Sequence, residues 1–316
     1  MSKFSAFFKK FGNVFIIIAL IVVFSMLNSA FLSFYNFMNI VRQIAMMGIV
    51  SVGFTFVLIG GGLDLSVSSQ IAFMNIMVAA MIENWGFNPV ISVVIGIFLT
   101  TCIGAFNGIV ISKTGIPPLI ATLAMQTVLR GAAYIISHGY PIYGIPEWIK
   151  FVGQGYLYEV IPFPGIILLV TIIAGTILLN KTYLGRHFYA LGSNAEATRL
   201  CGINVHLTRT ASYTILGFLT GVAGLIMLGR VGSGQPNIAS SFEMNVLTAC
   251  VIGGVSINGG KGSVLGAILG AVIIGILNNG MSIAGANEYW QMVITGTVLF
   301  SVVIIDSLSH IKKKAK

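Results

Sequence analysis

Apolar residues gather along this chain in long runs that are separated by short polar or glycine-rich segments. A helix needs about 20 mostly apolar residues, each adding about 1.5 Å, to cross the hydrocarbon core of a bilayer. About ten runs approach that length, and the pattern therefore predicts about ten membrane-spanning helices. They lie at residues 12–31, 43–60, 67–83, 89–112, 117–137, 163–180, 209–229, 243–258, 262–280 and 287–306.

The basic residues lie mainly at the ends of these runs and predict the orientation. Both termini are rich in lysine, and lysine-rich segments flanking membrane helices are typical of the cytoplasmic side. Ten spans bring both termini to one side, which agrees with this placement. Lys113, Lys261 and the segment 181–208 then fall inside. Arg42 and Arg230 fall outside as two exceptions.

The remaining polar segments are predicted to lie at or near the outer surface. The loop 138–162 falls outside and is rich in tyrosine and other aromatic residues, which suit an interfacial cap. Residues 31–42 are too short and too mixed to span, and an interfacial helix is expected there. The segment 230–243 is also too polar to span, and Gln235, Asn237 and Glu243 are candidates to face an entering solute or a docking partner.

Composition supports an all-α polytopic bundle in the cell membrane. Of the 316 residues, 56% are apolar and 8% are charged, whereas soluble domains carry about 25% charged residues. The 17 basic against 8 acidic residues follow the membrane pattern and do not indicate nucleic-acid binding. The three cysteines and four histidines share no ligand spacing, so we expect no metal, disulfide or cofactor.

The chain is interpreted as a single transmembrane domain over residues 1–316. Its first apolar run, 11–30, follows two lysines and resembles a signal peptide, but it exceeds the usual 7–15 apolar residues. An uncleaved first helix is the better interpretation. Glycines four apart, such as Gly262, Gly266 and Gly270, allow close packing of helices in lipid.

One glycine-rich segment, residues 60–69, interrupts an apolar stretch with three glycines and Asp64. Irregular backbone at membrane depth survives only against protein or a water-filled cavity. The functional interpretation is a helix break beside a solute path, with Asp64 and Ser66 near it. The alternative is a short surface loop in which Asp64 caps the next helix. The pattern leaves both open.

A second glycine-rich segment, residues 253–262, invites comparison with a phosphate-binding loop. That loop requires G-x-x-x-x-G-K-[ST], but Val255 replaces the first glycine and Gly262 replaces the hydroxyl residue, so nucleotide binding is rejected. The residues 57–61 and 250–254 are loosely alike. Since transporters often contain internal repeats, we treat this likeness as a weak repeat hypothesis.

The inner loop 181–208 contains a predicted short helix. Asn194 is a good N-cap residue, the residues to Leu200 favour a helix, and Gly202 is a plausible stop. Such a loop is either a plain connector or a docking element. Its length and its capped, mixed-charge helix favour docking to a soluble partner.

Together these segments resemble the ribose- and xylose-type permeases of bacterial ABC importers. The likeness covers about residues 35–306 and is carried by GGLDLSVSS (61–69), YALGSNAEATRLCGINV (189–205), GGVSINGGKG (253–262), QP (235–236) and LNNG (277–280). The inner-loop motif is the most specific part. Leu63 and Ser68 depart from the family pattern G-I-D-L-S-V-G-S, which weakens any inference about the solute.

The resemblance implies a division of labour among subunits. Two permease subunits, expected to be identical, form the pathway; a separate ABC ATPase docks beneath them; and an extracytoplasmic sugar-binding protein delivers the solute. The coupling residues are then Asn194, Glu196, Ala197, Thr198, Arg199 and Gly202. The candidate pathway residues are Asp64, Ser66, Gln235, Asn258, Asn278 and Asn279.

The expected function is translocation of a monosaccharide such as ribose with energy from the separate ATPase. One alternative is an ABC permease for a branched-chain amino acid or a sugar-derived signal molecule. Another is an ion-coupled secondary transporter, for which Asp64, Arg130 and Glu288 are the few candidate coupling residues. An enzyme is least favoured, because the sequence contains no nucleophile–base or metal constellation.

Overall fold

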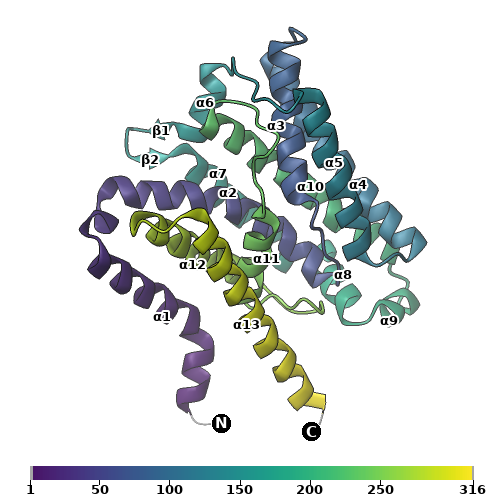
Figure 1. The fold of residues 1–316 in the computed structure, drawn as a ribbon. Coiled ribbons are helices and arrows are strands. Elements are labelled where there is room, and N and C mark those ends of the chain that lie inside the picture. The colour runs from purple at the N-terminus through teal and green to yellow at the C-terminus, as the bar shows by residue number, and fades with distance from the viewer. Residues whose placement is uncertain (1–2, 315–316) are drawn as a thin grey trace.

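The computed structural model describes residues 3–314, with side-chain surroundings for residues 12–304, and shows a helical bundle with one small hairpin (Figure 1). The α-helices are α1 (Lys3–Leu27), α2 (Phe34–Ile59), α3 (Val67–Glu83), α4 (Pro89–Thr114), α5 (Pro118–Ser137), α6 (Glu147–Gln154), α7 (Phe163–Lys181), α8 (Tyr183–Ser193), α9 (Ala195–Leu200), α10 (Val205–Val231), α11 (Phe242–Ile252), α12 (Val264–Ile283) and α13 (Glu288–Lys314). A 3-10 turn, η1 (Ser29–Leu32), precedes α2, and the antiparallel strands β1 (Tyr156–Leu157) and β2 (Ile161–Pro162) lie between α6 and α7.

Six of the described helices are long and apolar enough to cross a membrane: α2, α4, α5, α7, α10 and α12. Shorter apolar helices lie within α1, α3, α11 and α13. Every run predicted to span is therefore mainly helical, and the prediction of an all-α membrane bundle is confirmed. The hairpin is a small exception to it, because the outer loop pairs Tyr156 with Pro162 and Leu157 with Ile161.

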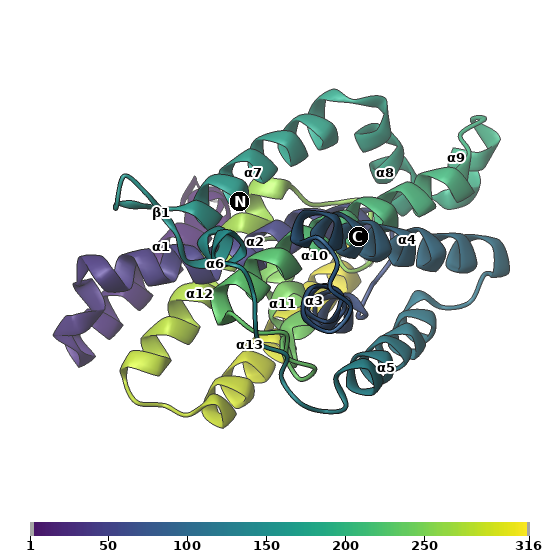
Figure 2. The same ribbon diagram turned by 90° about the horizontal axis from the view of Figure 1, so that it is seen from above.

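Helix α2 lies in the middle of the bundle (Figure 2). It packs against α7, α10, α11 and α12, and nearly every residue from Ile44 to Ile59 is buried. The helices α4 and α7 are more apolar than α2 but mostly unburied, so an apolar pattern on all sides does not by itself place a helix in the core.

Small residues bring two helix pairs into close contact. On α4, Gly104 packs against the backbone of Tyr213 on α10, and a Cβ at Gly217 would meet the backbone oxygen of Thr100. On α12, Gly270 packs in the same way against the backbone of Ala249 on α11. Such contacts replace the hydrophobic drive that lipid does not supply, and the packing role predicted for the α12 glycines is confirmed.

The separate interfacial helix predicted at residues 31–42 is wrong. Helix α2 begins at Phe34, where the Ser33 hydroxyl accepts the Asn36 N–H, and continues to Ile59. The polar residues in this stretch misled the prediction. Asn36 is buried rather than interfacial, since its amide donates to the Phe31 carbonyl at 2.9 Å and its oxygen accepts from Asn279 at 2.9 Å.

The loops occupy opposite ends of the bundle. Figure 1 places α6 and the hairpin at the top, with α8, α9 and both chain ends below them. The inner segment 181–208 holds two helices, α8 and α9, of which the sequence predicted only the second. The last predicted cytoplasmic lysine, Lys316, lies outside the described residues.

Candidate functional site

The two glycine-rich segments end their preceding helices with the same hydrogen bonds. After α2, the N–H groups of Gly60, Gly61 and Gly62 donate to the carbonyls of residues 56, 58 and 57. After α11, the N–H groups of residues 253, 254 and 255 donate to the carbonyls of residues 249, 251 and 250, the same pattern displaced by 193 positions. The second glycine of each has a left-handed backbone, with φ of 73° at Gly61 and 84° at Gly254. The same hydrogen bonds, with a left-handed glycine, also end α9 at Gly202 and α12 at Gly285, so this is a common helix ending and the repeat remains a prediction from sequence.

The three segments that carry the sequence resemblance meet at one place. The Gly260 N–H donates to the Ile59 carbonyl at 2.8 Å, which joins the second glycine-rich segment to the end of α2. The end of α8 lies against both, because Gly192 packs on the Ile59 carbonyl and on the Gly260 N–H. We call this convergence of 59–62, 189–193 and 259–262 the inner junction.

Glycine at position 192 is required by this packing. A Cβ added there would overlap the Ile59 carbonyl oxygen and lie 2.6 Å from the Gly260 nitrogen, far inside normal contact distances. Tyr189 adds a second link, because its hydroxyl donates to the Gly262 carbonyl at 2.8 Å. Burial raises the pKa of Tyr189, so its phenol keeps the proton that it donates.

Helix α9 projects from the junction and presents a mixed surface. Asn194 caps it through a hydrogen bond from the Ala197 N–H at 2.9 Å, and Gly202 ends it with φ of 80°. The predicted short helix and its start and stop signals are confirmed. Thr198 is buried, and its hydroxyl donates to the Asn194 carbonyl at 2.7 Å. It therefore stabilises the helix and is not part of the exposed surface.

The outward face of α9 carries charges and an apolar side chain. Arg199 donates to Glu196 at 2.6 Å, and both side chains are exposed. The hydrogen bond to Glu196 raises the pKa of Arg199. Leu200 is 77% exposed at the end of the helix, and Ala197 is exposed beside it.

Asp64 lies inside the protein, in a hydrogen-bonded cluster. Its carboxyl group accepts the Ser66 N–H at 2.9 Å and the Ser66 hydroxyl at 2.5 Å, and its second oxygen lies 3.5 Å from the Asn107 amide. Gln70 and Asn107 also donate to the Ser66 hydroxyl, at 2.8 and 3.1 Å. All four residues are buried. The detail that Asp64 caps α3 is wrong, because Ser66 occupies the N-cap position and Asp64 closes the turn before it.

The other predicted pathway residues lie in separate places. Asn258 is exposed near the inner junction, whereas Gln235 lies at the opposite end and donates to Ser233 at 3.2 Å. Asn279 is buried against Asn36. Asn278 lines a cavity of about 410 Å³ between α11, α12 and α13, which also contains Asn245, Thr248 and Gln291.

A further polar group joins α3, α5 and α11, and the sequence analysis assigned no role to its central member. The Gln126 amide donates to Ser68 at 3.3 Å and to Glu243 at 3.1 Å. A second cavity, of about 450 Å³, lies beside it and is lined by Ser69, Gln126, Thr127, Arg130, Gly131 and Tyr134. In the sequence, this group is indicated by Gln126, a lone glutamine in the middle of an apolar run. The two cavities lie on the face where α3 and α11 stand between α5 and α13 (Figure 2).

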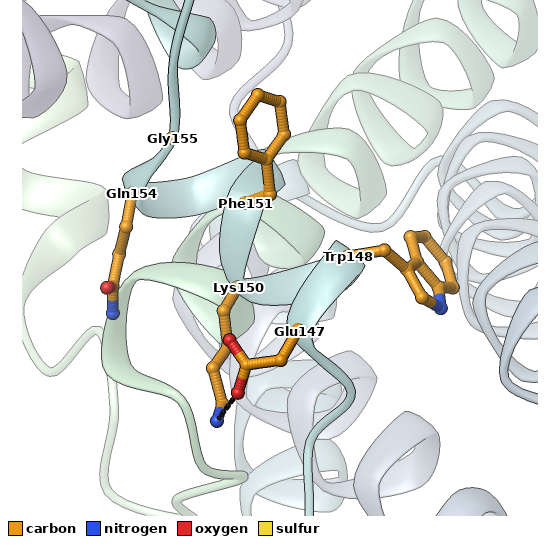
Figure 3. Close-up of a pocket in the computed structure, with 6 residues that line it drawn as sticks. All are labelled: Glu147, Trp148, Lys150, Phe151, Gln154 and Gly155. Carbon is orange, nitrogen blue, oxygen red and sulfur yellow. Dashed lines mark hydrogen bonds and ion pairs between the residues drawn. The ribbon is translucent and has the colours of Figure 1, made fainter. Parts of the chain in front are cut away.

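Helix α6 carries a shallow cavity of about 460 Å³ on its surface (Figure 3). Trp148 and Phe151 flank it, and Lys150 pairs with Glu147 at 2.6 Å. Figure 3 shows the two aromatic rings pointing away from the ion pair. The position of these aromatic residues relative to a membrane surface remains a prediction from sequence.

Comparisons with known proteins agree over nearly the whole chain. The family model described as "Branched-chain amino acid transport system / permease component" matches residues 36–303. A ribose import permease protein of Bacillus subtilis (strain 168) is 36% identical over 305 residues, covering 96% of this chain and 94% of the relative. The ribose import permease protein of Escherichia coli (strain K12) is 35% identical over 294 residues, covering 92% and 91%.

A xylose transport system permease protein of Haemophilus influenzae is 31% identical over 347 aligned residues, covering 91% of this chain and 92% of the relative. No solved structure matches the chain. The inner junction and the cavity-bearing face between α5 and α13 are the two features of this chain that suit a transport role.

Proposed function

This chain belongs to the branched-chain amino acid transport system permease component family, and from that premise we propose that it imports a monosaccharide such as ribose as one subunit of an ATP-binding-cassette transporter. The family assignment confirms the identification made from sequence. The chain is accordingly a membrane-embedded transport component and not an enzyme. Its relatives are named for ribose and xylose, which favours a pentose as the solute.

The convergence at the inner junction carries this proposal. A docking helix on a long flexible connector would move alone, but α8 ends against the backbone of α2 and of the second glycine-rich segment. Movement of α9 is therefore passed to the helix pairs α2–α3 and α11–α12. We expect a cytosolic ATPase to bind α9 and to shift these helix pairs during its cycle of ATP binding and hydrolysis. This is an alternating-access mechanism.

The coupling residues divide into two roles. Glu196, Ala197 and Arg199 are exposed and are assigned to contact the ATPase. Asn194, Thr198 and Gly202 form the caps and the internal hydrogen bond that keep α9 helical. The exposed Leu200 is added to the contact surface, since a desolvated apolar anchor contributes most to such interfaces.

The proposed topology has ten spans, with both termini in the cytoplasm and one domain over the whole chain. Each span corresponds to one of the ten apolar helices, and α6 and the hairpin then lie outside. The inner junction, with Lys261 and α9, lies inside. Both chain ends lie on the same side of the bundle in Figure 1, which supports this arrangement.

The pathway is assigned to the face between α5 and α13, closed by a second permease subunit that is expected to be a copy of this chain. Cavities lined by several polar side chains on spanning helices suit a water-filled path better than a lipid contact. Asn278 lies on this face, and Gln235 lies in the outer segment that precedes α11. Asp64 and Ser66 lie behind it, where they fix the α2–α3 turn, and Asn258 lies at its inner end. An extracytoplasmic binding protein delivers the solute from the outer side.

The coupling assignment is tested by reversing the α9 ion pair with Glu196→Arg and Arg199→Glu together. The reversed pair still bridges one turn of the helix, but it offers the opposite charges to a partner. We expect uptake of labelled ribose to fall at least tenfold in cells that also express the ATPase and binding protein, and the ATPase to be lost on co-purification.

The matched control is the other described ion pair of the same spacing, Glu147 with Lys150 on α6, reversed in the same way. That variant should keep the ATPase bound. Normal ribose uptake and ATPase binding in the α9 variant would remove the coupling role.

A second candidate solute, a branched-chain amino acid, is favoured by the description of the family model. Competition distinguishes the two, since unlabelled ribose should suppress uptake of labelled ribose whereas leucine should not. The ion-coupled alternative predicts uptake that survives loss of the ATPase and stops when the proton gradient is removed.

A further inference from the structure

The polar group between α3, α5 and α11 leaves two hydrogen-bonding atoms without a partner among the described residues. Glu243 lies in the first turn of α11, and its Oε1 accepts from Gln126 while its Oε2 accepts no hydrogen bond. On α3, the Ser69 hydroxyl is buried and also unpartnered, and Ser69 lines the cavity beside α5. Buried polar atoms of this kind are uncommon, because a polar group removed from water without a partner destabilises the fold.

Helix α5 reaches this polar group through one side chain. Gln126 is half-buried at the cavity wall and bridges Ser68 to Glu243 with its amide group. If α5 and α11 separate, Gln126 withdraws, and the Glu243 carboxylate and both α3 hydroxyls become open to the cavity.

Arg130 holds the segment before α11 and places a positive charge at the cavity wall. Its guanidinium donates to the Pro236 and Ile238 carbonyls at 2.8 and 2.9 Å, which anchors the segment that leads into α11. The Arg130 side chain also lines the cavity beside α5. A cationic solute would be repelled by the guanidinium and an anionic one by the carboxylate, so a neutral solute is favoured.

We propose that Glu243, Gln126 and Ser69 form a hydrogen-bonding station for the hydroxyl groups of a neutral polyol during translocation. A carboxylate accepts from hydroxyl groups, and the amide and the serine hydroxyl complete a set suited to neighbouring hydroxyls on one sugar. The inference rests on the proposed function, because it places the sugar on the same face. When no sugar is present, the groups bond to one another through Gln126. The exchange of one set of hydrogen bonds for another keeps binding weak, which passage requires.

Two cysteine substitutions on α5 test whether the cavity is part of a water-filled path. Thr127 lines the cavity, whereas Val128 is 63% exposed but does not line it. Thr127→Cys and Val128→Cys are each made with Cys102→Ser and Cys201→Ser, and the complex is placed in lipid nanodiscs with its ATPase and binding protein. We expect a hydrophilic thiol reagent to modify the Thr127→Cys variant at least tenfold faster than the Val128→Cys variant. Addition of ribose and ATP should change the modification rate of the Thr127→Cys variant only. Equal rates at both positions would overturn the proposal.

Transport by Glu243→Gln and Ser69→Ala tests the residues themselves. The ribose concentration that gives half-maximal uptake is set by the binding protein, so we expect it to be unchanged in both variants. The maximal rate of ribose uptake should be at least fivefold lower. ATP hydrolysis stimulated by the binding protein should persist, which shows that the complex is folded and coupled. The matched control is Glu83→Gln, an exposed carboxylate at the other end of α3. Uptake by both station variants equal to that of Glu83→Gln would contradict the station.

The outcomes separate this inference from the proposed function. A wild-type complex that hydrolyses ATP with its binding protein but takes up no ribose contradicts the proposed solute. In that case the difference in modification rate between the Thr127→Cys and Val128→Cys variants tests the station independently of ribose. Dependence of uptake on a sodium or proton gradient, lost in Glu243→Gln, would instead make Glu243 an ion-coupling residue and overturn the proposal.

Discussion

At the scale of single residues, buried polar groups fix the turn between α2 and α3. Asp64, Ser66, Gln70 and Asn107 form a cluster that joins this turn to α4. A polar group removed from water needs a hydrogen-bonding partner to offset the cost of its burial. Each member of the cluster therefore depends on the others, and a change at one position should be compensated only at its partner.

Asp64→Asn places an amide where the Asn107 amide now approaches a carboxyl oxygen. Two donors then face each other in a buried site, and we expect the free energy of unfolding to fall by about 1–3 kcal/mol. The midpoint of thermal unfolding in detergent micelles measures this change. The exchanged pair, Asp64→Asn with Asn107→Asp, restores one donor and one acceptor. It should recover part of the loss, because the Asn107 amide that donates to the Ser66 hydroxyl is still missing. A double variant no more stable than the single one would contradict the cluster.

At the scale of elements, glycines decide which segments touch at the inner junction. Two of them, Gly61 and Gly254, end α2 and α11 with left-handed backbone that other residues adopt at a cost. Gly192 serves a different purpose, since it allows the end of α8 to lie directly on the Ile59 carbonyl. Close contact between backbones leaves little freedom, so α8 and the two helix breaks should move as one body.

Gly192→Val inserts a branched side chain between α8 and the end of α2. We expect the inner junction to separate and ribose uptake to fall at least tenfold, because the push on α9 is no longer transmitted. ATPase binding should be retained, since the surface of α9 is unchanged. The control is Gly12→Ala in α1, where a Cβ would meet no atom within 4 Å. That variant should transport normally. Normal transport in Gly192→Val would contradict the coupling role of the junction.

At the scale of the whole molecule, the proposed topology puts the inner junction and the outer cap on opposite sides of the membrane. Cys201 follows α9 and is exposed, Cys250 is buried, and Cys102 is exposed on the apolar helix α4. Tyr158 is 86% exposed in the outer hairpin. These positions allow each side to be labelled separately.

A thiol reagent that cannot cross membranes should label Cys201 in inside-out vesicles and leave it unlabelled in intact cells, in a Cys102→Ser background. Tyr158→Cys, made with Cys102→Ser and Cys201→Ser, should show the reverse. Mass spectrometry of the labelled peptides measures both. Labelling of Cys201 from outside intact cells would invert the topology and remove α9 from reach of a cytosolic ATPase.

The sequence alone determined the membrane class, the place of each apolar helix and the family, because helix formation in lipid depends on local apolar length and on hydrogen bonds within one segment. It also determined the capped helix at Asn194, since capping involves neighbouring residues only. Only the tertiary structure decided that Gly192 meets Ile59, that Asp64 bonds to Ser66 and Asn107 rather than capping α3, and that Gln126 links Ser68 to Glu243. These contacts join positions far apart in the chain, and they follow from the shapes of packed helices, which no local pattern records.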